Sequence, residues 1–182
     1  PLTNITIPDS VTSIGVEAFH NCRDLTSITI PDSVTSIGVE AFRDCRDMTT
    51  VTIGNGVTSI EERTFRRCRG LTSISIGDGV TSIGEEAFWY CTSLTSITIP
   101  DSVTSIGDGA FGRCTALATI EVGVGNANYT EVNGVLFNRE MTLLHTYPAP
   151  NTGANYVIPD GITSIGGAAF HSSSSLTSIC LL

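Results

Sequence analysis

The cysteines are the residues of this 182-residue chain whose spacing first suggests chemistry. Five of them lie 23 residues apart, namely Cys22, Cys45, Cys68, Cys91 and Cys114. Structural zinc sites use cysteine pairs separated by about two to four residues, so this spacing does not predict a metal site. Cysteines stacked side by side come within disulfide range, but parallel side chains rarely reach the required torsion. We therefore expect a column of buried free thiols and assign no role to Cys180.

The remaining reactive residues do not combine into a catalytic or cofactor site. The three histidines are His20, His145 and His171, and no serine and acid accompany them in an arrangement typical of a triad. The Gly-Val-Gly triplet at 123–125 lacks the third glycine and the helix of a dinucleotide-binding loop. We expect no enzyme activity and no cofactor.

Acidic residues also recur at the same period. The column comprises Asp9, Asp32, Asp78 and Asp101, with Asn55 at the remaining position. Repeated carboxylates suggest calcium, but each acid follows a Pro or Gly at a turn, where Asp and Asn cap the backbone. We interpret the column as turn caps, and no metal site is predicted.

Arginines and aromatic residues form the most distinctive surface pattern. Seven of the nine arginines share a few places of the 23-residue period: Arg23, Arg43, Arg46, Arg66, Arg67, Arg69 and Arg113. Acids concentrate just before them, which predicts a basic edge beside an acidic edge. Trp89 and Tyr90 lie in the basic columns, and exposed Trp, Tyr and Arg are typical of binding hot spots. We predict a partner-binding surface at Trp89, Tyr90, Arg43, Arg66, Arg67 and Arg113; the alternative is a surface of ion pairs and cation–π contacts without a partner.

A second candidate surface consists of hydroxyl side chains that alternate with apolar residues. Its candidate binding residues are Thr29, Thr50, Thr52, Ser73, Ser75 and Thr98. Protein binding is the interpretation we favour. A carbohydrate would need more aromatic rings on this face, and ice binding is disfavoured because Ser replaces Thr in half of the pairs.

Composition excludes several classes of protein. The chain has 25 Thr, 19 Ser and 19 Ile but no Lys, and its hydrophobic fraction of 41% is sufficient for a folded core. The net charge of −9 argues against a general nucleic-acid binder. Proline or serine residues interrupt both long uncharged stretches, 141–159 and 161–182, so neither resembles a membrane span.

An internal repeat positions all of these residues. Repeats of 23 residues begin at Leu2, Leu25, Met48, Leu71, Leu94 and Leu117. In the copy from Leu25, residues 25–30 predict a short strand, residues 31–33 a turn, residues 34–37 a second inward-facing pair and residues 39–45 a short helical turn. One inward column is Phe19, Phe42, Phe65, Phe88 and Phe111, followed by Phe170. Such periodicity predicts a solenoid of stacked coils.

The repeat divides the chain. Regular copies cover residues 2–116, a divergent stretch covers about 117–155, and the pattern resumes over 156–182. We expect a single solenoid over residues 1–182. Both ends lie inside the pattern without an atypical polar capping repeat, which predicts a fragment of a longer chain.

The motif LxxIxIPxxVTSIGxxAFxxC, present at residues 25–45 and 94–114, resembles the BspA-like, Treponema-type leucine-rich repeats. The divergent segment NANYTEVNGVLFN resembles an irregular repeat of the same family. The resemblance implies an α/β-type leucine-rich-repeat solenoid, in which short parallel strands form a curved sheet and short helical or irregular segments lie opposite. The Asn of the general leucine-rich consensus is missing after the strand, so no Asn ladder is expected.

The same resemblance implies a non-catalytic interaction or adhesion module of a cell-surface or secreted protein. Its expected partner is a host matrix or cell-surface protein, with no nucleic acid and no direct membrane span. The alternative is a structural scaffold or accessory subunit, in an organelle or a larger assembly, docked to neighbouring subunits. A carbohydrate- or ice-binding surface is a minor alternative.

Overall fold

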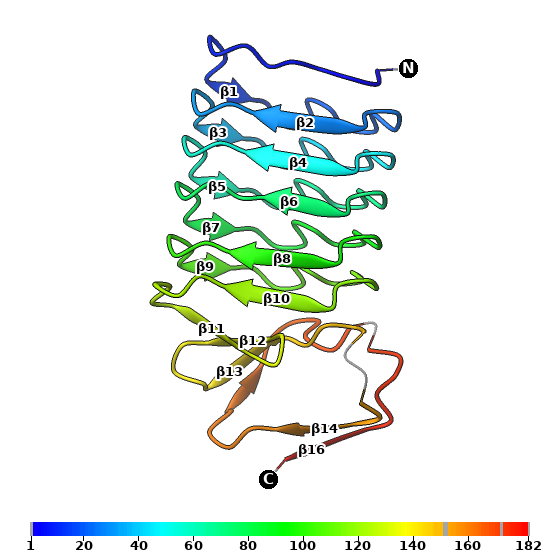
Figure 1. The fold of residues 1–182 in the computed structure, drawn as a ribbon, viewed down its shortest axis with the longest axis vertical. Helices are drawn as coiled ribbons and strands as arrows, with labels where there is room; N and C mark the ends of the chain where they lie inside the picture. The colour runs from blue at the N-terminus through cyan, green and yellow to red at the C-terminus, as the bar shows by residue number, and fades with distance from the viewer. Residues whose placement is uncertain (1, 151–152, 172, 182) are drawn as a thin grey trace.

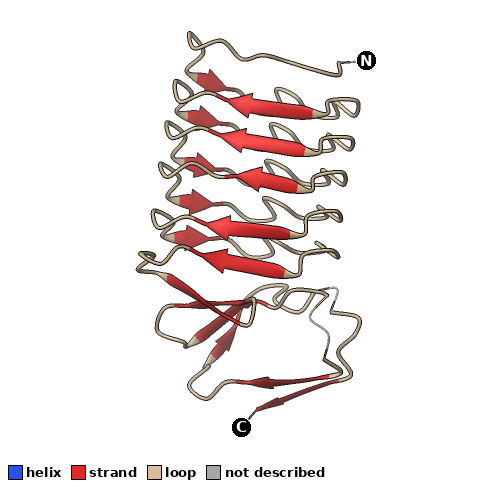
Figure 2. Cartoon of the chain, viewed as in Figure 1, coloured by secondary structure: helices blue, strands red, loops and turns tan. Residues whose placement is uncertain are grey.

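The computed structural model describes residues 2–150, 153–171 and 173–181. The chain winds into a stack of coils along one long axis, with the N-terminus at one end and the C-terminus at the other (Figure 1). All regular elements of the described residues are strands, joined by turns and loops (Figure 2). The predicted solenoid architecture is therefore confirmed.

The four coils that begin at Leu25, Met48, Leu71 and Leu94 each contribute one longer and one shorter strand, while the coil before them has a shorter strand only and the copy after them begins with a longer one. The longer strands are β2 (Ser27–Ile30), β4 (Thr50–Ile53), β6 (Ser73–Ser75), β8 (Ser96–Ile99) and β10 (Thr119–Val122). The shorter strands are β1 (Ser13–Ile14), β3 (Ser36–Ile37), β5 (Ser59–Ile60), β7 (Ser82–Ile83) and β9 (Ser105–Ile106). Neighbouring coils pair in parallel with a 23-residue register, as in Ser27 opposite Thr50. The period of the sequence is thus the circumference of one coil.

The divergent and resumed parts of the chain carry the remaining strands. They are β11 (Tyr129–Val132), β12 (Val135–Asn138), β13 (Leu143–Thr146), β14 (Asn155–Ile158), β15 (Ser164–Ile165) and β16 (Ser178–Leu181). Strands β11 and β12 form an antiparallel hairpin, and β13 continues that sheet to β15. Strand β14 pairs in parallel with β16.

Alternation of side chains explains the strands. In β2, Ile28 and Ile30 are buried while Ser27 and Thr29 face solvent. Because successive strand residues point to opposite faces, this pattern directs one hydrophobic column inward in every coil. The turn that follows each strand begins with Pro or Gly, which sets the chain to reverse toward the shorter strand.

The predicted helical turn is wrong: no described residue lies in a helix. In the coil from Leu25, Glu40 and Asp44 both have a positive φ, 57° and 60°, which interrupts right-handed helix. Their backbone N–H groups donate to the next coil, at Glu62 and Arg66. Backbone groups that a helix would pair internally instead join neighbouring coils, so this side of the solenoid is a ladder of turns.

A stack of phenylalanines fills the core. The rings of Phe19, Phe42, Phe65, Phe88 and Phe111 lie 5.2 to 5.8 Å apart between centroids, with planes within 7° of parallel. The expected continuation to Phe170 is wrong, because that ring stacks on Tyr147 at 5.3 Å in a second hydrophobic cluster. The divergent segment therefore ends the first aromatic column.

The cysteine column is confirmed as free thiols. Cys45, Cys68, Cys91 and Cys114 are buried, Cys22 is half-buried, and no disulfide joins them. Each of the four buried thiols donates to the carbonyl oxygen of a phenylalanine in the preceding coil, at 3.1 to 3.2 Å. Burial raises the pKa of Cys45 and Cys114 to about 12, which keeps these thiols protonated as donors.

Two side chains of the divergent segment complete the exposed edge of β9. The hydroxyl oxygen of Tyr129 accepts a hydrogen bond from the N–H of Ile106 at 2.8 Å, and Nε2 of His145 lies 3.1 Å from the carbonyl oxygen of Ile106. The two rings meet edge-on, with centroids 6.0 Å apart. A Tyr and a His thus take the place of the backbone that the next regular coil would supply.

His145 should make stability depend on pH. Burial lowers the pKa of His145, against opposing contributions from the Ile106 hydrogen bond and Asp108. In the unfolded chain the imidazole has a pKa of about 6.5, so as the pH falls it binds a proton before the folded protein does. The contribution of His145 to stability is therefore fully present above that pH and is lost as the pH falls below it. One proton gives a slope of up to about 1.4 kcal/mol per pH unit.

We expect His145→Gln to reduce the loss of unfolding free energy between neutral and acidic pH, measured by urea denaturation. The matched control is His20→Gln, because His20 contacts only Glu17 near the surface. An unchanged pH slope in His145→Gln would show that the buried imidazole does not carry the effect.

Candidate interaction surface

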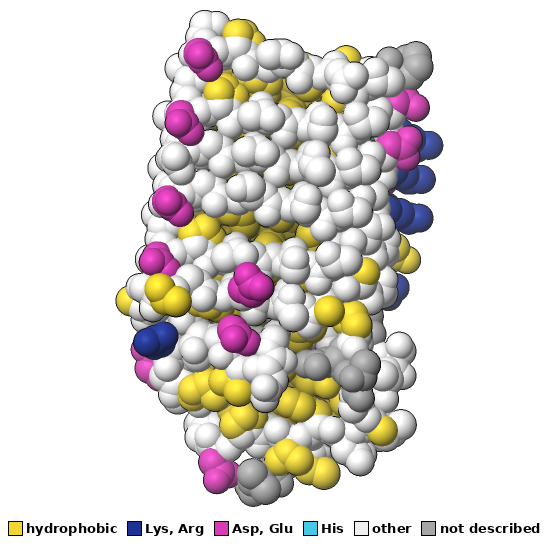
Figure 3. Space-filling view, in the orientation of Figure 1, with side chains coloured by type: hydrophobic (Ala, Val, Ile, Leu, Met, Phe, Trp, Pro, Cys, Tyr) yellow, Lys and Arg dark blue, Asp and Glu magenta, His cyan; other side chains and the backbone are white. Residues whose placement is uncertain are grey.

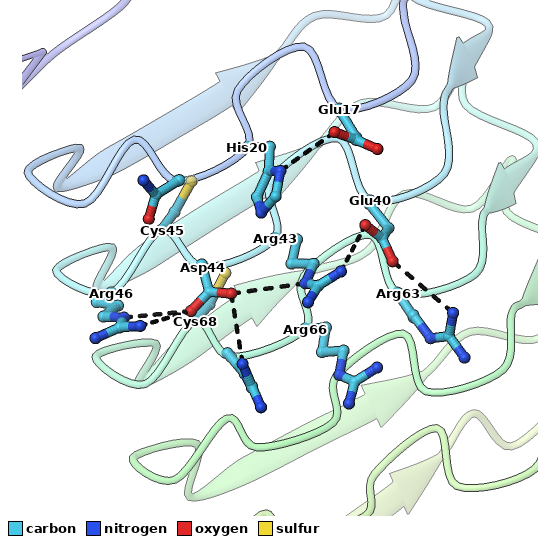
Figure 4. Close-up of polar contacts among 12 residues, drawn as sticks. Glu17, His20, Glu40, Arg43, Asp44, Cys45, Arg46, Arg63, Arg66 and Cys68 are labelled. Atoms are coloured by element: carbon cyan, nitrogen blue, oxygen red, sulfur yellow. Dashed lines mark hydrogen bonds and ion pairs between the residues drawn. The ribbon is translucent and has the colours of Figure 1, made fainter.

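The arginine columns lie on the turns that precede the longer strands, and many of their charges are paired there (Figure 4). Arg43 contacts Glu40 at 2.8 Å. Arg66 contacts Glu86 of the next coil, also at 2.8 Å. Glu86 also receives Arg63 at 2.8 Å. The acidic and basic columns therefore lie beside one another, and ion pairs between them neutralise much of the charge of both.

Asp44 organises a second group of arginines. Its carboxylate is buried and lies 3.0 Å from Arg46, 3.6 Å from Arg43 and 3.9 Å from Arg67. Burying a carboxylate is costly unless cations surround it, which explains why three arginines converge here. The only signal for this role in the sequence is the position of an acid within the basic columns. Arg66 and Arg67 thus contribute to the stacking of coils, whereas Arg43 pairs within its own coil.

Four exposed arginines lack a carboxylate partner among the described residues: Arg23, Arg69, Arg113 and, outside the arginine columns, Arg139. Arg23 contacts only the side chain of Asn21. Arg69 and Arg113 both lie over the ring of Tyr90, at 5.0 and 5.5 Å from its centroid. We call Arg69, Tyr90 and Arg113 the arginine–tyrosine stack. It is the part of the predicted basic surface whose cations remain available.

Trp89 is half-buried rather than exposed. Its ring packs on the His171 ring, with centroids 4.9 Å apart, at the contact between the regular coils and the resumed repeat. A Cβ atom built on Gly112 would lie 2.2 Å from two atoms of the Trp89 ring, so the glycine makes room for the indole. In the same place, the N–H of Gly109 donates to the carbonyl oxygen of Gly167. Trp89 therefore packs between the regular coils and the resumed repeat.

The hydroxyl side chains fall into two groups. One group, outside the strands, donates to the equivalent carbonyl oxygen of the preceding coil, as Thr49 does to Thr26 and Thr81 does to Thr58, both at 3.1 Å. The other group lies outward on β2, β4, β6 and β8, and we call it the strand face: Ser27, Thr29, Thr50, Thr52, Ser73, Ser75, Ser96 and Thr98.

The strand face is exposed and free of charge along four coils. Of its eight side chains, Thr98 alone has a hydrogen-bond partner within the described structure, Glu121 at 3.2 Å. Figure 3 shows the upper part of this face as an area of uncharged side chains, with acidic side chains along its left margin and both basic and acidic ones along its right margin. The sequence-predicted residues Thr29, Thr50, Thr52, Ser73 and Ser75 thus lie together with their hydroxyls unused.

The acidic column serves turns, as predicted. The carboxylate of Asp32 accepts the N–H of Asn55 in the next coil at 2.7 Å, and the side chain of Asn55 accepts the N–H of Asp78 at 2.9 Å. Asp101 accepts the N–H of Gly125 at 3.0 Å. Within the residues that the structure describes, no three His, Cys, Asp or Glu side chains gather as metal ligands.

Comparison with known proteins identifies the family. A model of the BspA type leucine rich repeat region matches six copies over residues 1–143 and 151–182. The chain belongs to the BspA-type leucine-rich-repeat family. No curated protein matches it. Among the residues described, this BspA-type chain has no helix that could cross a membrane.

Solved structures share the BspA-type fold. A leucine-rich-repeat protein from Eubacterium ventriosum is 29% identical, with a TM-score of 0.69 over 86% of this chain and 50% of that protein. A leucine rich cell surface protein from Faecalibacterium prausnitzii is also 29% identical, with a TM-score of 0.63 over 93% and 60% of the two chains. The pneumococcal vaccine antigen PcpA, at 23% identity and a TM-score of 0.78 over 98% and 53%, shows the fold alone. The chain spans half to three-fifths of these structures.

The packing of Trp89 on Gly112 predicts a loss of stability in Gly112→Ala. The added methyl would overlap the indole, so we expect about 1–3 kcal/mol of destabilisation, or a Tm lower by several degrees. Trp89→Ala removes the obstacle, so the cost of Gly112→Ala should fall in the double variant. Thermal unfolding of the three variants measures this coupling.

Gly15→Ala is the matched control, because nothing lies within 4 Å of a Cβ built at Gly15. Additive effects of the two substitutions would mean that Trp89 does not fill the space beside Gly112.

Proposed function

We propose that this solenoid is a non-catalytic protein-binding module of a surface or secreted protein, and that the arginine–tyrosine stack binds an acidic partner. The observation that carries the proposal is that Arg69 and Arg113 are exposed and flank Tyr90 without a carboxylate of their own. Arginine and tyrosine are enriched among residues that dominate binding energy, since both combine large contact area with hydrogen bonding.

The strand face extends this binding surface. The stack lies on the turns that lead into β6, β8 and β10, next to the outward hydroxyls of those strands. Unused hydroxyls accept or donate hydrogen bonds without the desolvation cost of a buried charge. We include Thr29, Thr50, Thr52, Ser73, Ser75 and Thr98 in the proposed contact, with Arg69 and Arg113 providing charge complementarity.

The name of a related protein supports a location outside the cell. The structural neighbour from Faecalibacterium prausnitzii, at 29% identity, is described as a cell surface protein. We propose the same kind of location for this chain and a host matrix or cell-surface protein as its partner. Membership of a repeat family does not by itself supply an activity, so the surface must be tested directly.

A binding assay against immobilised extracellular matrix proteins tests the proposal. We expect Arg69→Ser and Arg113→Ser each to weaken binding roughly tenfold, since a hot-spot residue contributes more than about 1 kcal/mol. Binding should also weaken when salt is raised, because screening reduces attraction between exposed charges. Thr52→Ala should give a smaller loss.

Arg139→Ser is the matched control, since Arg139 is an exposed arginine on the β11–β12 hairpin and the change in net charge is the same. Equal losses in Arg69→Ser and Arg139→Ser would contradict a site at the stack. Binding that none of these changes affects would favour the alternative function of a structural scaffold.

A further inference from the structure

The column of longer strands is interrupted, and one edge of β14 is left unpaired. Strand β4 pairs with β2 on one side and with β6 on the other, whereas β14 pairs with β16 alone among the described strands. Between β10 and β14 the chain runs through β11, β12 and β13, which pair with one another and with β15 (Figure 1).

No described residue supplies a backbone partner to the second edge of β14. The alternate N–H and C=O groups of residues 155–158 on that edge therefore lack the ladder that regular coils have. An open strand edge is a template for another strand, because its donors and acceptors are already aligned.

A groove runs beside this edge. It has a volume of about 300 Å³ and lies between the β11–β12 hairpin and β14, with Val132, Val135, Tyr147, Tyr156 and Val157 among its lining residues. Val132 and Val157 remain 43% and 46% exposed, which is unusual for valines beside a hydrophobic cluster. In Figure 3, hydrophobic side chains reach the surface in this C-terminal part of the face.

The repeat indicates which kind of peptide would fit beside β14. Strand β4 accepts on both sides a strand in which hydroxyl and aliphatic residues alternate, as in the Ser-Ile-Thr-Ile of β2. A strand of this pattern beside β14 would pair its backbone with the open edge and direct its aliphatic side chains into the groove. Glu131 and Asp160 directly adjoin the lining residues Val132 and Pro159 in the sequence and are exposed, so their charges disfavour an acidic segment.

We propose that the open edge of β14 binds an extended, non-acidic peptide segment of a partner protein as an added strand. Main-chain hydrogen bonds hold the segment, and the valine and tyrosine side chains of the groove select alternate aliphatic residues. The site uses none of the arginine–tyrosine stack or strand-face residues, so it does not depend on the function proposed above.

The test uses the intact chain and a capped heptapeptide, Leu-Thr-Ser-Ile-Thr-Ile-Pro, with the sequence of residues 94–100. We expect saturable amide shifts by NMR that are confined to residues 132–135 and 153–159. The same peptide carrying N-methyl groups at its Ser and second Thr keeps its side chains but loses two donors. Binding of the methylated peptide should be at least about tenfold weaker, as expected when main-chain hydrogen bonds provide affinity.

Val157→Arg, which places a large charged side chain at the groove, should abolish the shifts. Val124→Arg is the matched control, because Val124 is fully exposed in the turn after β10. Three results would each overturn the proposal: no saturable binding, shifts centred on the first coil at Ile5 and Ile7, or equal binding of the methylated peptide.

Discussion

In-register stacking is the constraint on which the rest of the structure depends. Each coil must place its hydrogen-bond acceptors where the donors of the next coil reach them. Thr49 donates to Thr26, the Cys68 thiol donates to Phe42, and the N–H of Asn55 donates to Asp32. These partners are 23 or 26 residues apart, so a single inserted residue would displace all of them together. The abundance of Thr, Ser and Ile follows from this constraint, because every coil uses the same residue types at the same positions.

The structure of the regular coils could largely be predicted from the sequence, because equivalent residues of successive coils have the same surroundings. The strand around Ile28 and Ile30, the buried thiols and the turn-capping role of Asp32 all follow from local patterns. The helical turn was predicted from the same stretch and is absent. Glu40 and Asp44 adopt positive φ because neighbouring coils compete for their N–H groups, a non-local effect that helix propensity does not contain.

The divergent segment was the least predictable part, since its residues have no equivalents from which to read a role. Asn126 is buried, and its side chain donates to the carbonyl oxygens of Pro100 and Val103 while accepting the N–H groups of Asn128 and Tyr129. It therefore satisfies four backbone groups at the point where the regular turn ends. Such a residue can be recognised only when the end of the regular coils is known, because two of the groups that it satisfies, the carbonyl oxygens of Pro100 and Val103, come from the preceding coil.

The hydrogen bonds, ion pairs and ring contacts within the solenoid also distinguish side chains with a structural role from side chains that are available to a partner. A side chain that is already bonded or packed within the solenoid is less available to a ligand. Arg43 is paired with Glu40 of its own coil, and Arg66 is paired with Glu86 of the next coil. Trp89 packs on His171. These three residues are therefore less accessible than the rest of the predicted surface. Three kinds of group remain more available to a partner. The strand-face hydroxyls point away from the core, the arginine–tyrosine stack has cations in excess of carboxylates, and β14 faces a hairpin that pairs elsewhere. Because stacking satisfies the interior of the solenoid, its capacity for binding lies in outward side chains of the regular coils and in a strand whose next neighbour has been displaced.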